Sequence, residues 1–270
     1  MSQRIVQVDS FTSEPFRGNP AAVCVLGGPA EPEWMQNVAR EMNLSETAFL
    51  HCESEAYRLR WFTPTTEVEL CGHATLASAH VLWEDGHVAP TEVVRFDTLS
   101  GRLEARRVAE WIELDFPSRP AGQPAAADEA KALAEALGTT PVSTAHNLFD
   151  YIVELASEEA VRAVRPDFGR LARIARRGVI VTAAASQELA AAGVDFVSRF
   201  FAPAYGVNED PVTGSAHCTL GPFWELRLGR SNLTGFQASE RGGHVRVQVR
   251  GDHVRLLGQA VTVLEGVLLV

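Results

Sequence analysis

The chain has 270 residues, of which 46% are hydrophobic and 21% are charged, and its formal net charge is −10. This composition is typical of a globular protein with enough apolar residues for a core, and it excludes disordered, collagen-like and coiled-coil chains. The acidic balance argues against nucleic acids and anionic membranes as main partners. Lys131 is the only lysine and lies in an alanine-rich segment, which argues against Schiff-base and pyridoxal mechanisms.

The first half of the chain is predicted to contain two helices among several strands. Strands are indicated by period-two alternation or short apolar runs, and helices by apolar residues at helical spacing. The expected strands are 5–11, 21–26, 44–51, 57–62, 93–96, 101–106 and 110–116, and the expected helices are 32–42 and 72–83. The second helix is alanine-rich and apolar on nearly every side, which is typical of a buried helix.

A Pro/Ala-rich stretch at 118–128 is the expected linker to the second half. That half is predicted to contain helices at 128–137, 167–177 and 215–226, with strands at 151–155, 178–183, 196–201, 245–249, 254–257 and 260–270. The helix at 167–177 carries several arginines, and a solvated helix face is a simpler interpretation of them than an anion site.

Two segments of similar pattern indicate an internal duplication. Arg60-Trp61-Phe62-Thr63-Pro64 matches Arg199-Phe200-Phe201-Ala202-Pro203, and each is followed by an acidic loop and a helix that begins with glycine. We therefore expect an α+β protein of two pseudosymmetric lobes, each a curved antiparallel sheet around a central helix, with a cleft between them. The expected lobes are 1–117 and 129–270, and the last strand has the option of pairing back with the N-terminal lobe.

The two glycine-bearing helix starts, at Gly72 and Gly214, are candidate anion sites. A helix N-terminus presents unpaired N–H groups, and glycine lets a ligand approach the backbone closely. A pseudo-twofold axis would bring both amides to one substrate carboxylate. The alternative is that the glycines only permit tight packing of helix on sheet.

Glu46 is the candidate general acid/base. On an extended strand it shares a face with Leu44, Ala48 and Leu50, and if that face is buried we expect its pKa to rise to about 6 or 7. In the alternative orientation Phe49 points inward and Glu46 faces solvent. The alternation alone does not decide between the two orientations.

Three further polar residues lie near the two helix starts. His73 follows Gly72, Ser215 follows Gly214, and Asp210 precedes a proline in the loop before the second helix. His73 could orient a substrate or move a proton, although a histidine there is more often a cap or a packing residue. Asp210 and Ser215 could equally be helix caps. No metal site is expected, because the histidines of this region recur every seven residues along one helix.

Five blocks in chain order resemble the PhzF-like (phenazine biosynthesis-like) isomerase family. The blocks are Asp9-Ser10-Phe11-Thr12 with Gly18-Asn19-Pro20-Ala21-Ala22-Val23, Asn43-Leu44-Ser45-Glu46-Thr47, Phe62-Thr63-Pro64, Cys71-Gly72-His73-Ala74-Thr75, and Glu209-Asp210-Pro211-Val212-Thr213-Gly214-Ser215-Ala216. The resemblance covers essentially the whole chain. It implies the diaminopimelate epimerase-like fold, a cofactor-independent proton shift in a small carboxylate substrate, and often a homodimer.

The resemblance also implies roles for individual residues. Glu46 would move the proton, while His73, Asp210 and Ser215 would hold and polarise the substrate. The expected substrate-binding positions are Gly72 and Gly214, whose amides would bind the carboxylate, and Ser45, which lies beside the base. The family pattern is specific to the reaction type and not to the substrate, so a role in phenazine biosynthesis does not follow.

Two alternatives stay open from the sequence. A two-base racemase or epimerase would use Cys71, but the matching position in the second half is Thr213, which cannot act as a thiolate base. A binding or scaffold protein of the same fold would have kept the cleft and lost catalysis. The four cysteines show no disulfide or zinc spacing, so we expect reduced thiols. No signal or membrane segment is apparent in the sequence, which predicts a cytoplasmic protein.

Overall fold

The computed structural model describes residues 2–174 and 176–269. The chain forms two compact units, which we call unit 1 (1–116 and 255–270) and unit 2 (117–254). Strand β9 (Gln123–Pro124) and the start of helix α3 (Ala127–Leu137) lie in the segment expected as a linker, 118–128. The last strand, β18 (Ala260–Leu269), pairs with β1 (Ser2–Ser10), which is the pairing that the sequence left open.

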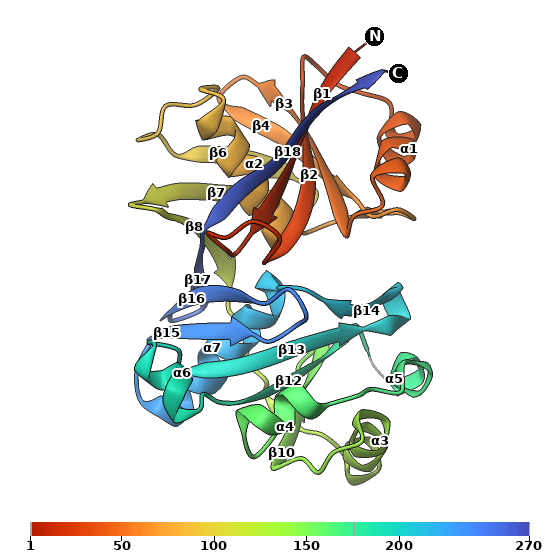
Figure 1. Ribbon diagram of the computed structural model, residues 1–270, viewed down its shortest axis with the longest axis vertical. Helices are drawn as coiled ribbons and strands as arrows, with labels where there is room; N and C mark the ends of the chain where they lie inside the picture. Colours follow the sequence, from red (N-terminus) through yellow and green to blue (C-terminus); the bar gives the residue numbers. More distant parts are fainter. Residues whose placement is uncertain (1, 175, 270) are drawn as a thin grey trace. The chain divides into compact units, whose positions relative to one another are not determined.

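Unit 1 is a mixed sheet with two helices (Figure 1). β1 pairs antiparallel with β2, β2 parallel with β3, β3 antiparallel with β4, and β4 parallel with β6. Its other elements are β2 (Asn19–Leu26), α1 (Pro32–Met42), β3 (Glu46–Glu53), β4 (Ala56–Phe62), β5 (Glu67–Val68), α2 (Gly72–Glu84), β6 (Val94–Thr98), β7 (Gly101–Val108), β8 (Trp111–Pro117) and most of β17 (His253–Gly258).

The two helices of unit 1 differ in how they are buried. α2 contacts β1, β2, β3 and β18, and its side chains from His73 to Ala79 are all buried. Its small residues let the strands approach on every side, which confirms the expected buried helix. α1 is amphipathic, and Met35 and Val38 on its apolar face pack with Phe49 of β3. It ends at Asn43, whose left-handed conformation (φ 51°) is one that asparagine tolerates.

Unit 2 repeats this arrangement. The strands β11, β12, β13, β14, β15 and β16 pair with the same directions as β2, β3, β4, β5, β6 and β7, and α7 follows β14 as α2 follows β5. Its elements after α3 are β10 (Ser143–His146), β11 (Asp150–Glu154), α4 (Glu158–Ala163), α5 (Phe168–Ile174), β12 (Gly178–Ala184), α6 (Gln187–Ala191), β13 (Phe196–Ala202), a 3₁₀ turn (Pro203–Tyr205), β14 (Val207–Asp210), α7 (Gly214–Leu228), β15 (Asn232–Gln237) and β16 (Gly243–Arg250).

The match extends to the pairing directions, so the duplication inferred from one short motif holds over most of each unit. The basic helix expected at 167–177 is shorter, because α5 ends at Ile174, and residue 175 lies outside the described residues. Across the described chain, every helix is too short or too polar to cross a bilayer.

Candidate active site

Glu46 and His73 form the centre of the candidate site in unit 1. Glu46 is the first residue of β3, and one of its carboxylate oxygens lies 3.2 Å from Nε2 of His73 in the first turn of α2. The side chains are only 18% and 6% exposed, respectively. The carboxylate is therefore largely removed from water.

The orientation of Glu46 follows from the layers around β3. This strand is buried on both faces, since Phe49 packs against α1 while β3 also contacts α2. Alternating residues point to opposite faces, so Glu46 shares the α2 face with Ala48 and Leu50. Both orientations considered from the sequence assumed one solvent-facing side, and the structure has none in the centre of the strand.

Two residues fix the imidazole of His73. The side-chain amide nitrogen of Asn19 lies 3.2 Å from Nδ1, and Ser10 donates its hydroxyl to the backbone carbonyl of His73 at 2.8 Å. Because an amide NH₂ group can only donate, Nδ1 accepts and the ring proton resides on Nε2. Nε2–H of His73 is therefore the ring group that lies 3.2 Å from the Glu46 carboxylate.

Burial keeps this imidazole uncharged. Desolvation lowers the pKa of His73 to about 3, because the charged form cannot be hydrated in the interior. At neutral pH a neutral imidazole thus lies beside the Glu46 carboxylate. A neutral ring brings a polar N–H group close to the carboxylate without placing a full positive charge beside it.

Cys71 is the third reactive side chain of this cluster. It is buried immediately before α2, and its Sγ lies 3.5 Å from Nδ1 of His73. One ligand atom each from Glu46, Cys71 and His73 lie within 4.8 Å of one another. The sequence predicts no metal here, but carboxylate, thiolate and imidazole are a donor set that Zn²⁺ accepts.

The start of α2 is suited to an anion. Cys71 has an extended backbone (φ −144°, ψ 106°) and its side chain makes no capping hydrogen bond to the helix. The helix dipole and the first-turn amides, beginning at Gly72, favour a negative group at this end. Ser45, half-buried, directly precedes Glu46 at the start of β3. Unit 1 thus holds Ser45, Glu46, Gly72 and His73 in one region.

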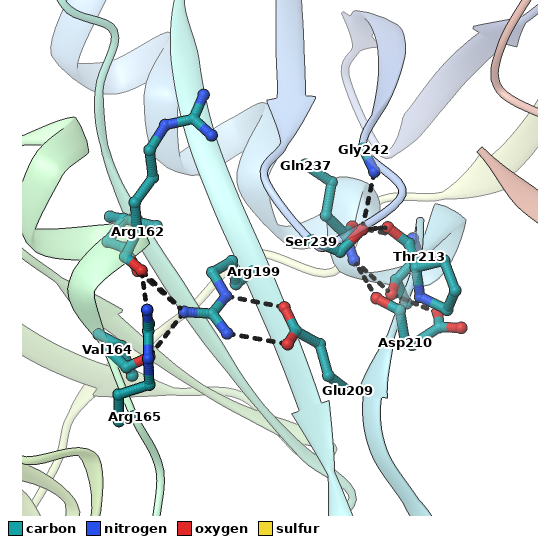
Figure 2. Close-up of polar contacts among 12 residues, drawn as sticks. Arg162, Val164, Arg165, Arg199, Glu209, Asp210, Thr213, Gln237, Ser239 and Gly242 are labelled. Atoms are coloured by element: carbon teal, nitrogen blue, oxygen red, sulfur yellow. Dashed lines mark hydrogen bonds and ion pairs between the residues drawn. The ribbon is translucent and has the colours of Figure 1, made fainter. Parts of the chain in front are cut away.

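Unit 2 holds the other three candidate residues at the start of α7. Asp210 ends β14 and accepts a hydrogen bond from the hydroxyl of Thr213, while Gln237 donates to the Asp210 carbonyl at 2.7 Å and accepts from the Thr213 amide at 2.9 Å (Figure 2). Gly214 and Ser215 begin the helix. The capping position falls on Thr213, not on Asp210 or Ser215, and the Thr213 side chain makes no capping bond.

The sequence of this fold matches a known family along nearly its whole length. Residues 8–266 match the family model described as phenazine biosynthesis-like protein, PhzC-PhzF. The chain belongs to this family. The resemblance found in the five sequence blocks is thereby confirmed.

Relatives within and beyond the family agree with this assignment. An uncharacterized isomerase of Halalkalibacterium halodurans is 51% identical, with 100% of this chain and 99% of the relative covered. The crystal structure of a PhzF-family protein from Enterococcus faecalis is 41% identical, with a TM-score of 0.92 and both chains fully covered. A predicted epimerase of Pseudomonas aeruginosa, 23% identical with a TM-score of 0.79 over 99% of each chain, shares the fold.

The chain is therefore an isomerase with the expected α+β, epimerase-type fold. Two of its site residues were missed from the sequence. Ser10 and Asn19 belong to the quoted blocks, but nothing in the pattern indicated that they hold His73. Gly18 could have indicated this tight turn beside Ser10 and Asn19. Its backbone is left-handed (φ 61°), and a Cβ at this position would lie 2.1 Å from the Ser10 carbonyl oxygen, so only glycine fits.

Proposed function

We propose that the protein is a cofactor-independent isomerase that moves a proton between two carbons of a small carboxylic acid, with Glu46 as the general acid/base. The observation that supports this proposal is the largely buried Glu46 carboxylate held by a neutral, fixed His73. A general base needs a defined position and limited hydration, and both are met here.

The proposed reaction balances without an oxidant. The Glu46 carboxylate removes a proton from one carbon, and the electron pair of that C–H bond delocalises into the conjugated system of the substrate. The protonated Glu46 then delivers a proton to a second carbon, where a new C–H bond forms. The substrate keeps its atoms and oxidation level, and Glu46 returns to its starting state.

In this proposal His73 is a positioning residue for Glu46 and a polar contact for the substrate. Its Nε2–H faces one carboxylate oxygen at 3.2 Å, and the other oxygen is assigned the proton exchange. Because Asn19 occupies Nδ1, the tautomer is fixed throughout the reaction. A charged imidazolium would instead stabilise the carboxylate and make it a weaker base.

Binding of the substrate carboxylate is assigned to the start of α2. The amide of Gly72 and the helix dipole attract the anion, and Ser45 beside Glu46 adds a hydroxyl. In unit 2, α7 also begins with an extended residue followed by glycine, so we assign Gly214 and Ser215 to an equivalent anion-binding helix start, with Asp210 as a partner for an amino or hydroxyl group.

A racemase that uses Cys71 is the second candidate, because the thiol contacts the same imidazole. Its weakness is the lack of a second thiol at the matching helix start, where Thr213 stands, while Cys218 donates to the Gly214 carbonyl at 3.7 Å within α7. Replacing Cys71 by alanine separates the two candidates. A Glu46-based isomerase retains turnover in this variant, whereas a thiol-based racemase loses it.

The test of the proposed function is deuterium incorporation from heavy water into a panel of small unsaturated and cyclic carboxylates, followed by mass spectrometry. The wild type should label at least one of them, and Glu46→Gln should lower the rate by about 10²- to 10⁴-fold while binding is retained. Glu55→Gln, at an exposed turn between β3 and β4, is the matched control and should behave as wild type. Exchange that is equal in Glu46→Gln and wild type would refute the assignment, and a lack of exchange with every compound would favour a binding protein.

A further inference from the structure

We propose that unit 1 carries a second small-molecule site, for a monocarboxylate with a short apolar tail. The site is a pocket of about 280 Å³ beside α1, which we call the outer pocket. It is lined by Arg58 and Arg60 of β4, by Phe49 and His51 of β3, and by apolar side chains that include Met35 and Leu99.

The outer pocket is separate from the candidate active site. Phe49 lies opposite Arg60 and His51 opposite Arg58 in the antiparallel pair of β3 and β4, so these four side chains share one face of the sheet. Phe49 packs toward α1 on this face. Glu46 is on the other face of β3, against α2, where it contacts His73. A ligand in the outer pocket would not touch Glu46.

The internal repeat indicates what the pocket is built to bind. In unit 1, Arg60 donates Nε and Nη2 to the two carboxylate oxygens of Glu67 at 2.7 and 2.8 Å. In unit 2, Arg199 donates the same two nitrogens to Glu209 at 2.7 and 2.8 Å (Figure 2). Each guanidinium also lies over the phenylalanine two residues later, at 5.2 Å in unit 1 and 4.9 Å in unit 2. The two arginines are therefore equivalent.

The third guanidinium nitrogen, Nη1, has different surroundings in the two arginines. In unit 2, Nη1 of Arg199 donates to backbone carbonyls at the end of α4, at 2.8 Å for Val164 and 3.2 Å for Val161 (Figure 2). These are the carbonyls that a helix C-terminus leaves without partners. Within the described residues, Nη1 of Arg60 has no such acceptor, and Arg60 lines the outer pocket instead. A ligand carboxylate would supply the oxygens that α4 supplies in unit 2.

Arg58 adds a second donor for the same carboxylate. In the part of the chain that the structure describes, it has neither a hydrogen bond nor an ion pair. Asp97, opposite Arg58 on β6, is held by Arg102 at 2.8 and 3.0 Å. Glu53 at the pocket is half exposed and bonded to His51 at 2.9 Å, so its charge is solvated and partnered. The donors that remain are the guanidinium group of Arg58 and Nη1 of Arg60, while Glu67, which also lines the pocket, stays paired with the other two nitrogens of Arg60.

Apart from the arginines and from His51, Glu53 and Glu67, the side chains that line the pocket are apolar, and they determine which ligand tail fits. Leu26, Met35, Phe49 and Leu99 surround the space next to the arginines. A volume of about 280 Å³ is at the small end for ligand pockets and suits a compound such as benzoate or hexanoate. A diacid or a phosphorylated sugar would place a second charge against these side chains.

The experiment is an NMR titration of ¹⁵N-labelled protein with benzoate, with benzyl alcohol as the uncharged analogue. Benzoate should give saturable shifts at residues of α1, β3 and β4 and at the arginine Nε groups, and benzyl alcohol should bind at least about tenfold more weakly. Arg58→Gln should weaken benzoate binding by a similar factor. Arg250→Gln, at an exposed position at the end of β16 in unit 2, should leave it unchanged.

Two further variants make the result decisive. Ala30→Phe fills the pocket without removing a charge and should abolish the shifts, so loss of binding does not depend on the stability of an arginine variant. Glu46→Gln should bind benzoate in the outer pocket as the wild type does, which separates this inference from the proposed function. Shifts confined to residues around Glu46 and His73, or benzoate affinity unchanged in Arg58→Gln and Ala30→Phe, would overturn it.

Discussion

Nδ1 of His73 lies 3.2 Å from the side-chain nitrogen of Asn19, and this contact determines which nitrogen of the imidazole faces Glu46 as a donor. The two residues are far apart in the sequence and come together because β2 runs beside the first turn of α2. The tautomer of the imidazole beside the candidate base is thus set by a residue of β2.

We expect Asn19→Ala to lower isomerase turnover by about tenfold or more, because the imidazole loses the donor that fixes its tautomer. The ¹⁵N chemical shifts of His73 report the tautomer directly and should change in this variant. Asn37→Ala, at an exposed position of α1, is the control. An unchanged tautomer in Asn19→Ala would contradict the assignment of the ring proton to Nε2.

Two buried histidines should make the protein sensitive to acid. Burial lowers the pKa of His73 to about 3 and that of His217 to about 4, both below the value of 6.5 in an unfolded chain. Between these values the unfolded chain binds a proton that the folded chain does not, so stability is complete above pH 6.5 and falls as the pH drops toward 4. Each histidine contributes about 1.4 kcal/mol per pH unit over that window.

Urea unfolding between pH 4.5 and 7 measures this slope. His217→Gln should reduce the pH dependence of the free energy of unfolding by an amount that corresponds to about one bound proton, because glutamine does not titrate. His217 is fully buried, and its Nδ1–H donates to the Thr213 carbonyl. His87→Gln, at an exposed turn, should leave the slope as it is. Equal slopes in the wild type and His217→Gln would show that His217 takes up its proton without unfolding.

Zinc should inhibit the enzyme. Glu46, Cys71 and His73 offer three ligand atoms within 4.8 Å, and a bound ion would occupy the proposed base. We expect Zn²⁺ to inhibit turnover reversibly, with recovery on adding a chelator, whereas Mg²⁺ should have no effect because thiolate and imidazole bind it poorly. Cys71→Ala should need at least about tenfold more Zn²⁺ for half inhibition. If its sensitivity equals that of the wild type, the ion binds elsewhere.

Gly18→Ala should destabilise unit 1 more than an ordinary glycine substitution does. A Cβ at this position would lie 2.1 Å from the Ser10 carbonyl oxygen, and the backbone is already left-handed. We expect a loss of about 2 kcal/mol or more in the free energy of unfolding, from strain and displacement of the Asn19 turn. Gly86→Ala has a similar φ (72°) with open space around it, and should cost about 1 kcal/mol. Equal losses would mean that the turn relaxes.

Long periodic elements could be predicted from the sequence. α1 was expected at 32–42 and lies there, because a proline at its start, apolar residues on one face and a terminal asparagine all agree. Several short elements, among them β5, β9 and β15, were missed. Their pairing is decided by neighbouring strands, and β15 contains Gly235, whose missing side chain leaves room for the ring of Phe196.

The environment of Glu46 could be predicted only in part. Its place on a strand was clear, but a strand covered by α1 on one face and α2 on the other has no solvent side for alternation to reveal. The hydrogen bonds from Asn19 and Ser10 to His73 depend on strand register, which no local pattern encodes. The outer pocket likewise became interpretable only when Arg60 and Arg199 could be compared atom by atom.

The pairing of β18 with β1 affects the order in which the chain can fold during synthesis. All of unit 2 has left the ribosome before residues 255–269 emerge, whereas unit 1 lacks its closing strand until then. Until then, the edge of β1 that pairs with β18 has no partner strand for its backbone hydrogen bonds, while unit 2 already has all its residues. Unit 2 can therefore complete its core before unit 1 gains this strand, and a chain released before residues 255–269 are made exposes the β1 edge to neighbouring polypeptides.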